Sequence, residues 1–156
     1  MAGAGLDRYG RAMPALKLSR TVVRYIWNEP SNRGRRACYL ARGLGWQLHK
    51  RLVRRPKLVR LWNGRLFLAD PADDMASFAF YARIFDSRHA LFVTAAADRG
   101  AMVDVGANVG LFALQLSHHF DEAVLYEASA EAARKAEDNM VRNRLDRHRV
   151  RAVAVG

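Results

Sequence analysis

The sequence predicts an α/β protein: half of a doubly wound, Rossmann-like parallel sheet, preceded by a helical extension and a β-hairpin. An apolar run, a glycine turn and a helix start follow one another over residues 102–112. Segments typical of strands and helices then alternate, and an Asn-Gly pair at 63–64 separates two short apolar runs. We therefore expect a basic helical extension at 1–55, a hairpin with lead-in helices at 56–98, and the half-sheet at 99–156.

The extension is predicted to be helical and strongly basic. Residues 1–60 hold 15 of the 26 Lys and Arg residues and only Asp7 and Glu29 as acids, a net charge of +13 within a chain of +11. We expect a helix at 15–27, a break at 29–32, and then a second helix. The apolar stripe of that second helix recurs at helical spacing: Ala37, Leu40, Ala41, Leu44, Leu48 and Leu52. We expect this stripe to pack on the rest of the protein while the arginines face water.

The remaining elements follow from apolar periodicity and turn residues. We expect, in chain order, hairpin strands at 58–62 and 65–68, helices at 77–85 and 87–97, a strand at 101–105, a helix to 118, a strand at 123–127, a helix at 130–144 and a strand at 150–155. On the helix at 130–144, four apolar side chains are expected on one face: Ala133, Ala136, Met140 and Val141.

Composition excludes several classes of protein. With 51% hydrophobic residues a packed core is expected and global disorder is not. The single cysteine, Cys38, excludes an internal disulfide and fits a reducing compartment. No run approaches the roughly 18 to 20 apolar residues of a membrane span, and the first residues lack the pattern of a secretory signal. We expect a cytoplasmic protein with no metal site.

The glycine turn has the features of a cofactor-binding loop. Gly106 and Gly110 let the backbone turn sharply and approach a ligand closely. Glu127 ends the next predicted strand, where an acid accepts hydrogen bonds from ribose hydroxyls. Asp104 lies two residues before the first glycine, and Asn108 stands where a dinucleotide loop has its second glycine. A carboxylate there suits the ammonium group of S-adenosylmethionine and repels a pyrophosphate.

These residues resemble a known family. Residues 103–112, Val-Asp-Val-Gly-Ala-Asn-Val-Gly-Leu-Phe, resemble the first motif of FkbM-type methyltransferases, a branch of the class I S-adenosylmethionine-dependent enzymes. Tyr126-Glu127 resembles their second motif, with Ala128 in place of the usual proline. Asn139 and Asn143 resemble the paired asparagines of the following helix, and residues 152–156 resemble the start of the third strand.

The resemblance implies the cofactor and the reaction. The loop residues would line the methionine end of S-adenosylmethionine, and Glu127 would bind its ribose; the loop set is Asp104, Gly106, Ala107, Asn108 and Gly110. Members of the family transfer a methyl group to a hydroxyl, often on a sugar or a secondary metabolite. The second half of the family's fold does not follow residue 156, so we expect a fragment or a chain completed by a partner or a second copy. No residue is assigned as the catalytic base.

Two other functions remain open. The chain could be a non-catalytic module whose basic arm contacts nucleic acid or, peripherally, an anionic membrane; we disfavour nucleic acid. It could also be a fragment of a nicotinamide-dependent oxidoreductase, because the loop and Glu127 occur at similar positions in dinucleotide-binding sheets.

Overall fold

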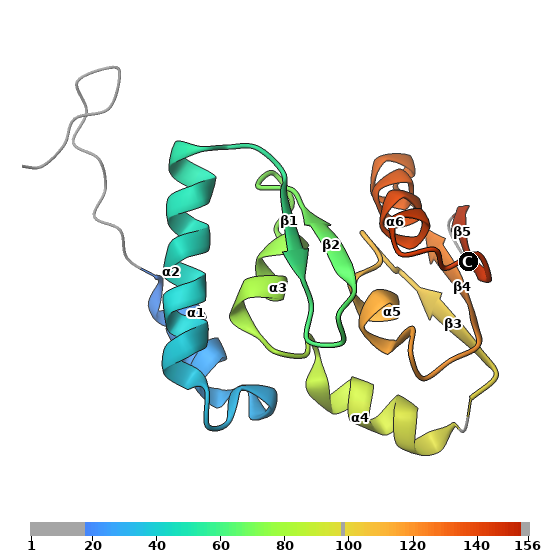
Figure 1. The fold of residues 1–156 in the computed structure, drawn as a ribbon, viewed down its shortest axis with the longest axis horizontal. Helices are drawn as coiled ribbons and strands as arrows, with labels where there is room; N and C mark the ends of the chain where they lie inside the picture. The colour runs from blue at the N-terminus through green and yellow to red at the C-terminus, as the bar shows by residue number, and fades with distance from the viewer. Residues whose placement is uncertain (1–17, 98, 154–156) are drawn as a thin grey trace, which may run out of the picture.

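The computed structural model describes residues 18–97 and 99–153. A pair of helices forms one end of the molecule, a hairpin lies in the middle, and a small sheet with its helices forms the other end (Figure 1). The elements are α1 (Arg20–Asn28), α2 (Arg36–Leu52), β1 (Lys57–Arg60), β2 (Leu66–Ala69), α3 (Phe78–Tyr81), α4 (Ser87–Ala96), β3 (Ala101–Val105), α5 (Leu111–Leu116), β4 (Glu122–Glu127), α6 (Ala130–Arg142) and β5 (His148–Ala152), with 3-10 turns at Pro30–Asn32 and Met75–Ser77. Within the described ranges, no helix has the length and apolar character needed to cross a bilayer.

The predicted parallel sheet is confirmed as a three-stranded sheet of order β3-β4-β5. Met102, Ala123 and Leu125 are buried on the face that α6 covers. On the opposite face, Val103 and Val105 are each 62% exposed. The chain is therefore an α/β protein whose parallel sheet, over the described residues, is covered on one face.

The third strand begins earlier than its apolar run predicts. Strand β5 starts at His148, which pairs with Ala123 of β4 and is itself buried. The start of this strand is set by its hydrogen-bonded pairing with β4 and not by where its apolar residues begin. Residues 154–156, the end of the predicted strand, lie outside the described residues, as do the first residues of the helix expected at 15–27.

The Asn-Gly hairpin is confirmed, and α6 fixes it to the sheet. Strands β1 and β2 pair antiparallel, with Val59 opposite Phe67, and Gly64 takes the left-handed φ of +85° in the turn. The free edge of β2 is bonded by Asn139 of α6 and by Asn143, the residue directly after that helix: the Leu68 N–H donates to Asn139 Oδ1 at 2.9 Å, and the Leu66 N–H donates to Asn143 Oδ1 at 2.8 Å.

Helix α2 buries the face opposite to the one expected. Trp46 is 1% exposed, stacks on Phe80 with ring centroids 4.2 Å apart, and donates from Nε1 to Ser77 Oγ at 3.0 Å. The predicted packing of the apolar stripe is wrong for Leu48 and Leu52, which are 42% and 59% exposed, whereas Leu40 at the edge of the stripe does pack against the core. The indole buries more apolar surface than a leucine and carries an N–H that finds a partner inside, so it decides which face turns inward.

The first of the two lead-in helices, predicted at 77–85, is shorter than expected because a buried asparagine ends it. Helix α3 stops at Tyr81, whereas the pattern predicted a helix to residue 85. Asn32, fully buried, donates from Nδ2 to the Tyr81 carbonyl at 2.8 Å, and its Oδ1 accepts from the Arg83 N–H at 2.9 Å. These bonds replace the hydrogen bonds of a further helical turn.

Candidate functional site

The turn between β3 and α5 is built from three left-handed residues. Gly106, Asn108 and Gly110 have φ values of +79°, +49° and +76°. A Cβ on Gly110 would lie 2.8 Å from Cε of Met140 and 3.3 Å from Cβ of Ala136, so this position is close to α6, and its left-handed φ favours glycine. A Cβ on Gly106 would have no described atom within 4 Å, so here only the backbone conformation requires glycine and the space beside it is open.

The N–H groups of this loop are turned toward the protein. Each of the five donates to a protein oxygen: Gly106 and Ala107 to the Tyr126 carbonyl at 2.8 and 3.0 Å, Asn108 to Glu127 Oε2 at 2.8 Å, Val109 to Asn108 Oδ1 at 2.8 Å, and Gly110 to the Ala107 carbonyl at 2.9 Å. Because these donors are already bonded, the loop does not offer them to a phosphate.

Asp104 is the unsatisfied group of the site. Its Oδ2 atom is buried and has no hydrogen-bond partner among the described residues. Burial, with a smaller contribution from the nearby carboxylate of Glu127, raises the pKa of this carboxyl to about 6. A buried acceptor without a donor is rare in proteins, and a ligand that brings a cationic donor would satisfy it.

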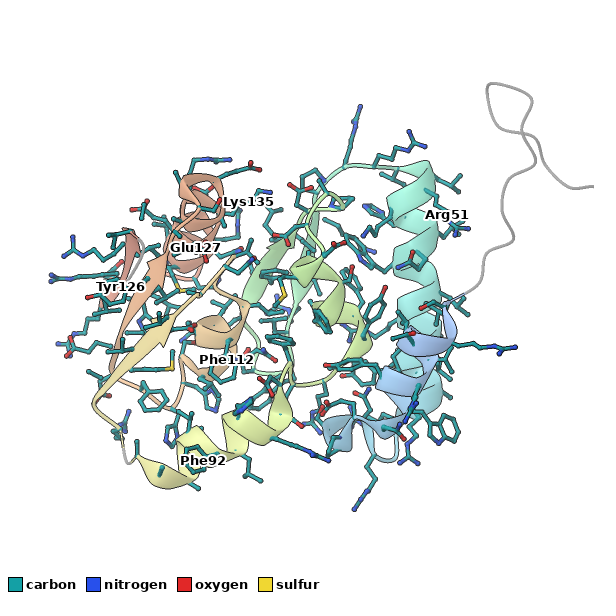
Figure 2. The ribbon with its side chains drawn as sticks, turned by 180° about the vertical axis from the view of Figure 1, so that it is seen from behind. Arg51, Phe92, Phe112, Tyr126, Glu127 and Lys135 are labelled. Atoms are coloured by element: carbon teal, nitrogen blue, oxygen red, sulfur yellow. The ribbon has the colours of Figure 1, made fainter. Side chains whose placement is uncertain are left out.

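Glu127 holds the loop instead of lining a cavity. Glu127 lies at the end of β4, next to α6 (Figure 2). Its Oε2 accepts from the Asn108 N–H of the loop and its Oε1 from the Ser129 N–H at the start of α6, both at 2.8 Å. A carboxylate has further lone pairs, so these bonds leave acceptor capacity on both oxygens. The expected ribose contact stays a prediction, and the observed role of Glu127 is to fix the loop to α6.

A cavity of about 310 Å³ lies beside the loop. Asp104 and residues 106–109 form one side of it, and the remaining lining comes from α5 and the lead-in segment: Leu111, Phe112, Met75, Phe85, Asp86, His89 and Val93. The structure thus brings together four predicted site residues, Asp104, Gly106, Ala107 and Asn108. Gly110 and Glu127 support the loop from outside the cavity.

The same cavity contains an acid–histidine pair that the sequence interpretation missed. His89 Nδ1 lies 2.6 Å from Oδ2 of Asp86, and both side chains line the cavity wall. Asp86 has a φ of +51°, a left-handed conformation that is costly for a residue with a Cβ. The Asp-x-x-His spacing at the start of α4 is the signal that could have found the pair, since residues three apart on a helix are neighbours.

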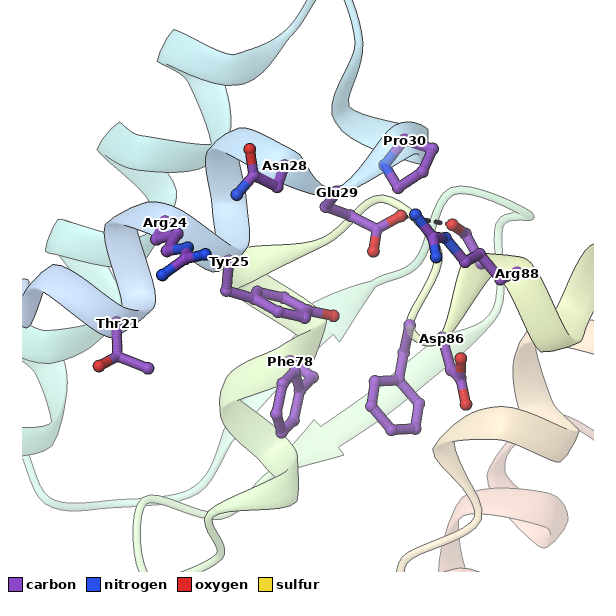
Figure 3. Close-up of a pocket in the computed structure, with 11 residues that line it drawn as sticks. Thr21, Arg24, Tyr25, Asn28, Glu29, Pro30, Phe78, Asp86 and Arg88 are labelled. Atoms are coloured by element: carbon purple, nitrogen blue, oxygen red, sulfur yellow. Dashed lines mark hydrogen bonds between the residues drawn. The ribbon is translucent and has the colours of Figure 1, made fainter.

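A second, larger cavity adjoins the first. It measures about 650 Å³ and lies between α1 and the start of α4 (Figure 3). Phe85 and Asp86 line both cavities. Its wall includes the rings of Tyr25 and Phe78, whose centroids are 5.3 Å apart. Burial raises the pKa of the Tyr25 phenol, with a smaller contribution from Glu29, so the phenol remains a hydrogen-bond donor.

Comparison with known proteins adds little to this geometry. No protein-family profile matches the sequence, and no curated protein matches it. Among solved structures, the chain is similar to the YcgJ protein from Bacillus subtilis at 20% sequence identity and a TM-score of 0.38, over 43% of this chain and 30% of that one. A likeness of this size carries no argument about the function of the chain.

Proposed function

We propose that this protein is an S-adenosylmethionine-dependent O-methyltransferase of the FkbM type that binds its cofactor in the 310 Å³ cavity. The observation that carries the proposal is Asp104, a residue of the cavity lining whose buried Oδ2 has no hydrogen-bond partner among the described residues. The methionine end of S-adenosylmethionine bears an ammonium group, which would satisfy this carboxylate with a charge-assisted hydrogen bond.

The loop favours this cofactor over a nicotinamide dinucleotide. A pyrophosphate needs free N–H groups at the glycine turn, and the five loop N–H groups already donate to protein oxygens. Asp104 would also repel the phosphates. The fragment of an oxidoreductase is therefore the weaker proposal.

Each residue of the site has a defined task in this proposal. When bound, S-adenosylmethionine supplies a methyl group made electrophilic by its sulfonium. Asp104 binds the ammonium group, the open side of Gly106 leaves room for the ligand, and Glu127 accepts hydrogen bonds from the ribose with its remaining lone pairs. His89 takes the proton of the acceptor hydroxyl on Nε2, while Asp86 holds the ring through Nδ1.

The 650 Å³ cavity is the proposed site of the acceptor. It adjoins the cofactor cavity at Phe85 and Asp86 and combines aromatic faces with polar side chains, including Arg24 and Asn28. Such a lining suits a polyhydroxylated molecule, that is, a sugar or a secondary metabolite with a free hydroxyl. Placement next to His89 would bring that hydroxyl to the proposed base.

We also propose that turnover needs further polypeptide on the open face of the sheet. Parallel sheets are covered on both faces in nearly all proteins, and Val103 and Val105 of β3 are exposed here. A completing partner or a second copy would supply that cover. Cofactor binding depends on the described loop and is therefore the step to test first.

Isothermal titration with S-adenosylhomocysteine, which keeps the ammonium group, tests the cofactor. We expect binding to the wild-type protein and at least a tenfold loss in Asp104→Asn, which keeps the shape and removes the charge. Asp121→Asn is the matched control, because Asp121 is an exposed carboxylate paired with Arg99 and lies outside the cavity lining. Stabilisation by NAD without binding of S-adenosylhomocysteine would overturn the proposal.

A further inference from the structure

The outward face of α2 is largely apolar, with Arg51 near its end as the charged exception. Its members are spaced three or four residues apart, on the side of the helix opposite the buried Trp46: Ala37, Ala41, Leu44, Leu48 and Leu52. The three leucines are 37%, 42% and 59% exposed, and Val53 directly after the helix is 50% exposed. In both views α2 lies at one end of the molecule, next to α1 (Figures 1 and 2).

Helix α1, which packs against α2, also exposes apolar side chains. Val23 and Trp27, four residues apart on one side of α1, are 37% and 52% exposed. Arg36, the first residue of α2, lies over the Trp27 ring at 5.1 Å and donates from Nε to the Trp27 carbonyl at 2.8 Å. The indole is thereby held beside the first turn of α2. We call the exposed side chains of residues 23, 27, 44, 48, 52 and 53 the outer face.

Nearly all charged side chains in the segment that carries the outer face are cationic. Residues 18–60 contain 12 Lys and Arg residues and one acid, Glu29. Glu29 is 8% exposed, and its Oε1 accepts hydrogen bonds from Ser31 and Ser87, so its carboxylate is not part of the exposed surface. The exposed cations occur at both ends of α2 and along α1: Arg20, Arg24, Arg33, Arg35, Arg54, Arg55 and Lys57.

We propose that the outer face docks on an anionic lipid bilayer surface, with α2 lying in the plane of the headgroups. An exposed aliphatic stripe bordered by arginines is the pattern of interfacial helices: the leucines enter the acyl boundary while the cations bind headgroups. Trp27, held beside the first turn of α2, is an exposed amphipathic ring of the kind favoured at a membrane interface. This surface is separate from the cavities proposed for methyl transfer, except that Arg24 also lines the acceptor cavity.

A second copy of the chain and a nucleic acid fit the outer face less well than an anionic bilayer does. A second copy packed symmetrically on this face would bring together two segments that each carry a net charge of +11 over residues 18–60. Nucleic acid would use the cations but would leave the leucines exposed, since single strands stack on aromatic rings and duplexes offer phosphates. An anionic bilayer satisfies the cations and the leucines together.

Vesicle co-sedimentation of the full chain tests this proposal. We expect binding to vesicles of phosphatidylcholine and phosphatidylglycerol in equal parts, and at least tenfold weaker binding to phosphatidylcholine alone. Leu44→Gln combined with Leu48→Gln keeps every charge and should reduce binding to the anionic vesicles at least tenfold. The matched control is Leu91→Gln with Phe92→Gln on α4, two apolar side chains that are 72% and 70% exposed and lie away from α2; this pair should bind as the wild type does.

Four results would overturn the proposal. They are equal binding to both kinds of vesicle, absence of binding to either, unchanged binding of the α2 double variant, and an equal loss in the α4 double variant. Two further measurements identify another occupant: an α2-dependent dimer in sedimentation equilibrium would replace the bilayer by a second copy, and equally tight, α2-dependent binding to a single-stranded oligonucleotide would replace it by nucleic acid. A blue shift of tryptophan emission with anionic vesicles, lost in Trp27→Phe, is the expected positive signature.

Discussion

Helices α2 and α6 are the two longest helices of the described chain. The predicted apolar stripe of α6 faces the core, whereas that of α2 faces outward. On α6 the predicted residues Ala133, Ala136 and Met140 are buried, and only Val141 was placed on the wrong side, at 71% exposure. On α2 the predicted leucine stripe faces outward and Trp46 faces inward.

The difference comes from what each helix offers on its second face. Helix α6 is charged on its outer side, with Arg134 and Asp138 paired there at 3.2 Å, so only one face can enter the core. Helix α2 is apolar on two sides, and the larger aromatic side chain takes the interior. Helical periodicity in a sequence identifies an apolar stripe. It predicts which stripe is buried only when the helix has a single apolar face.

The largest effect is expected for the inner face of α2. Trp46→Ala should lower the free energy of unfolding by about 3–5 kcal/mol, because it removes the stacking on Phe80 and leaves a cavity. Leu48→Ala, on the outer face of the same helix, should cost less than about 1 kcal/mol. Urea denaturation of both variants measures the contrast, and equal losses would mean that the leucine stripe is packed after all.

The next effect concerns the polar side of α6. Asn139 is 1% exposed; its Oδ1 accepts from the Leu68 N–H at 2.9 Å and its Nδ2 donates to the Val109 carbonyl at 3.1 Å. Asn139→Ala would leave both backbone groups buried without a partner, and should cost about 2–4 kcal/mol in the same assay. Asn28→Ala, at the exposed end of α1, is the control and should change stability by less than about 0.5 kcal/mol.

A third test concerns the loop that α6 supports. The folded pKa of Asp104 is about 6, above the ordinary 3.8, so the folded state binds the extra proton and stability falls as pH rises from about 4 to 6. Asp104→Asn removes this dependence and should stabilise the ligand-free protein at pH 7.5 by up to about 3 kcal/mol. Thermal unfolding from pH 4 to 8 measures it. A variant that is less stable at pH 7.5 would show that the carboxylate has a stabilising partner.

The smallest effect is expected on the outer face itself. Leu44→Gln with Leu48→Gln should change the free energy of unfolding by less than about 1 kcal/mol, since both side chains are already well exposed in the folded protein. Circular dichroism melting checks this, and it also shows that any loss of vesicle binding in that variant does not come from unfolding.

Much of the candidate site could be predicted because its signals are local in the sequence. The glycine turn, Asp104 before it and Glu127 at the end of the next strand follow from strand–turn–helix spacing, and parallel pairing brings them together. The His89–Asp86 pair could not be placed at the site from spacing alone. It reaches the cavity because α4 packs beside α5, a contact between elements that no local pattern encodes.

The sequence by itself determined the α/β class, the Asn-Gly hairpin, the parallel order of the last three strands and the positions of the loop acids, because backbone conformation and hydrophobic period act over short distances. Only the tertiary structure decided which face of α2 is buried, that Asn139 and Asn143 close the edge of β2, and that Asp104 is left without a partner. Each of these depends on which groups meet across distant parts of the chain, where burial and hydrogen-bond satisfaction are set by packing.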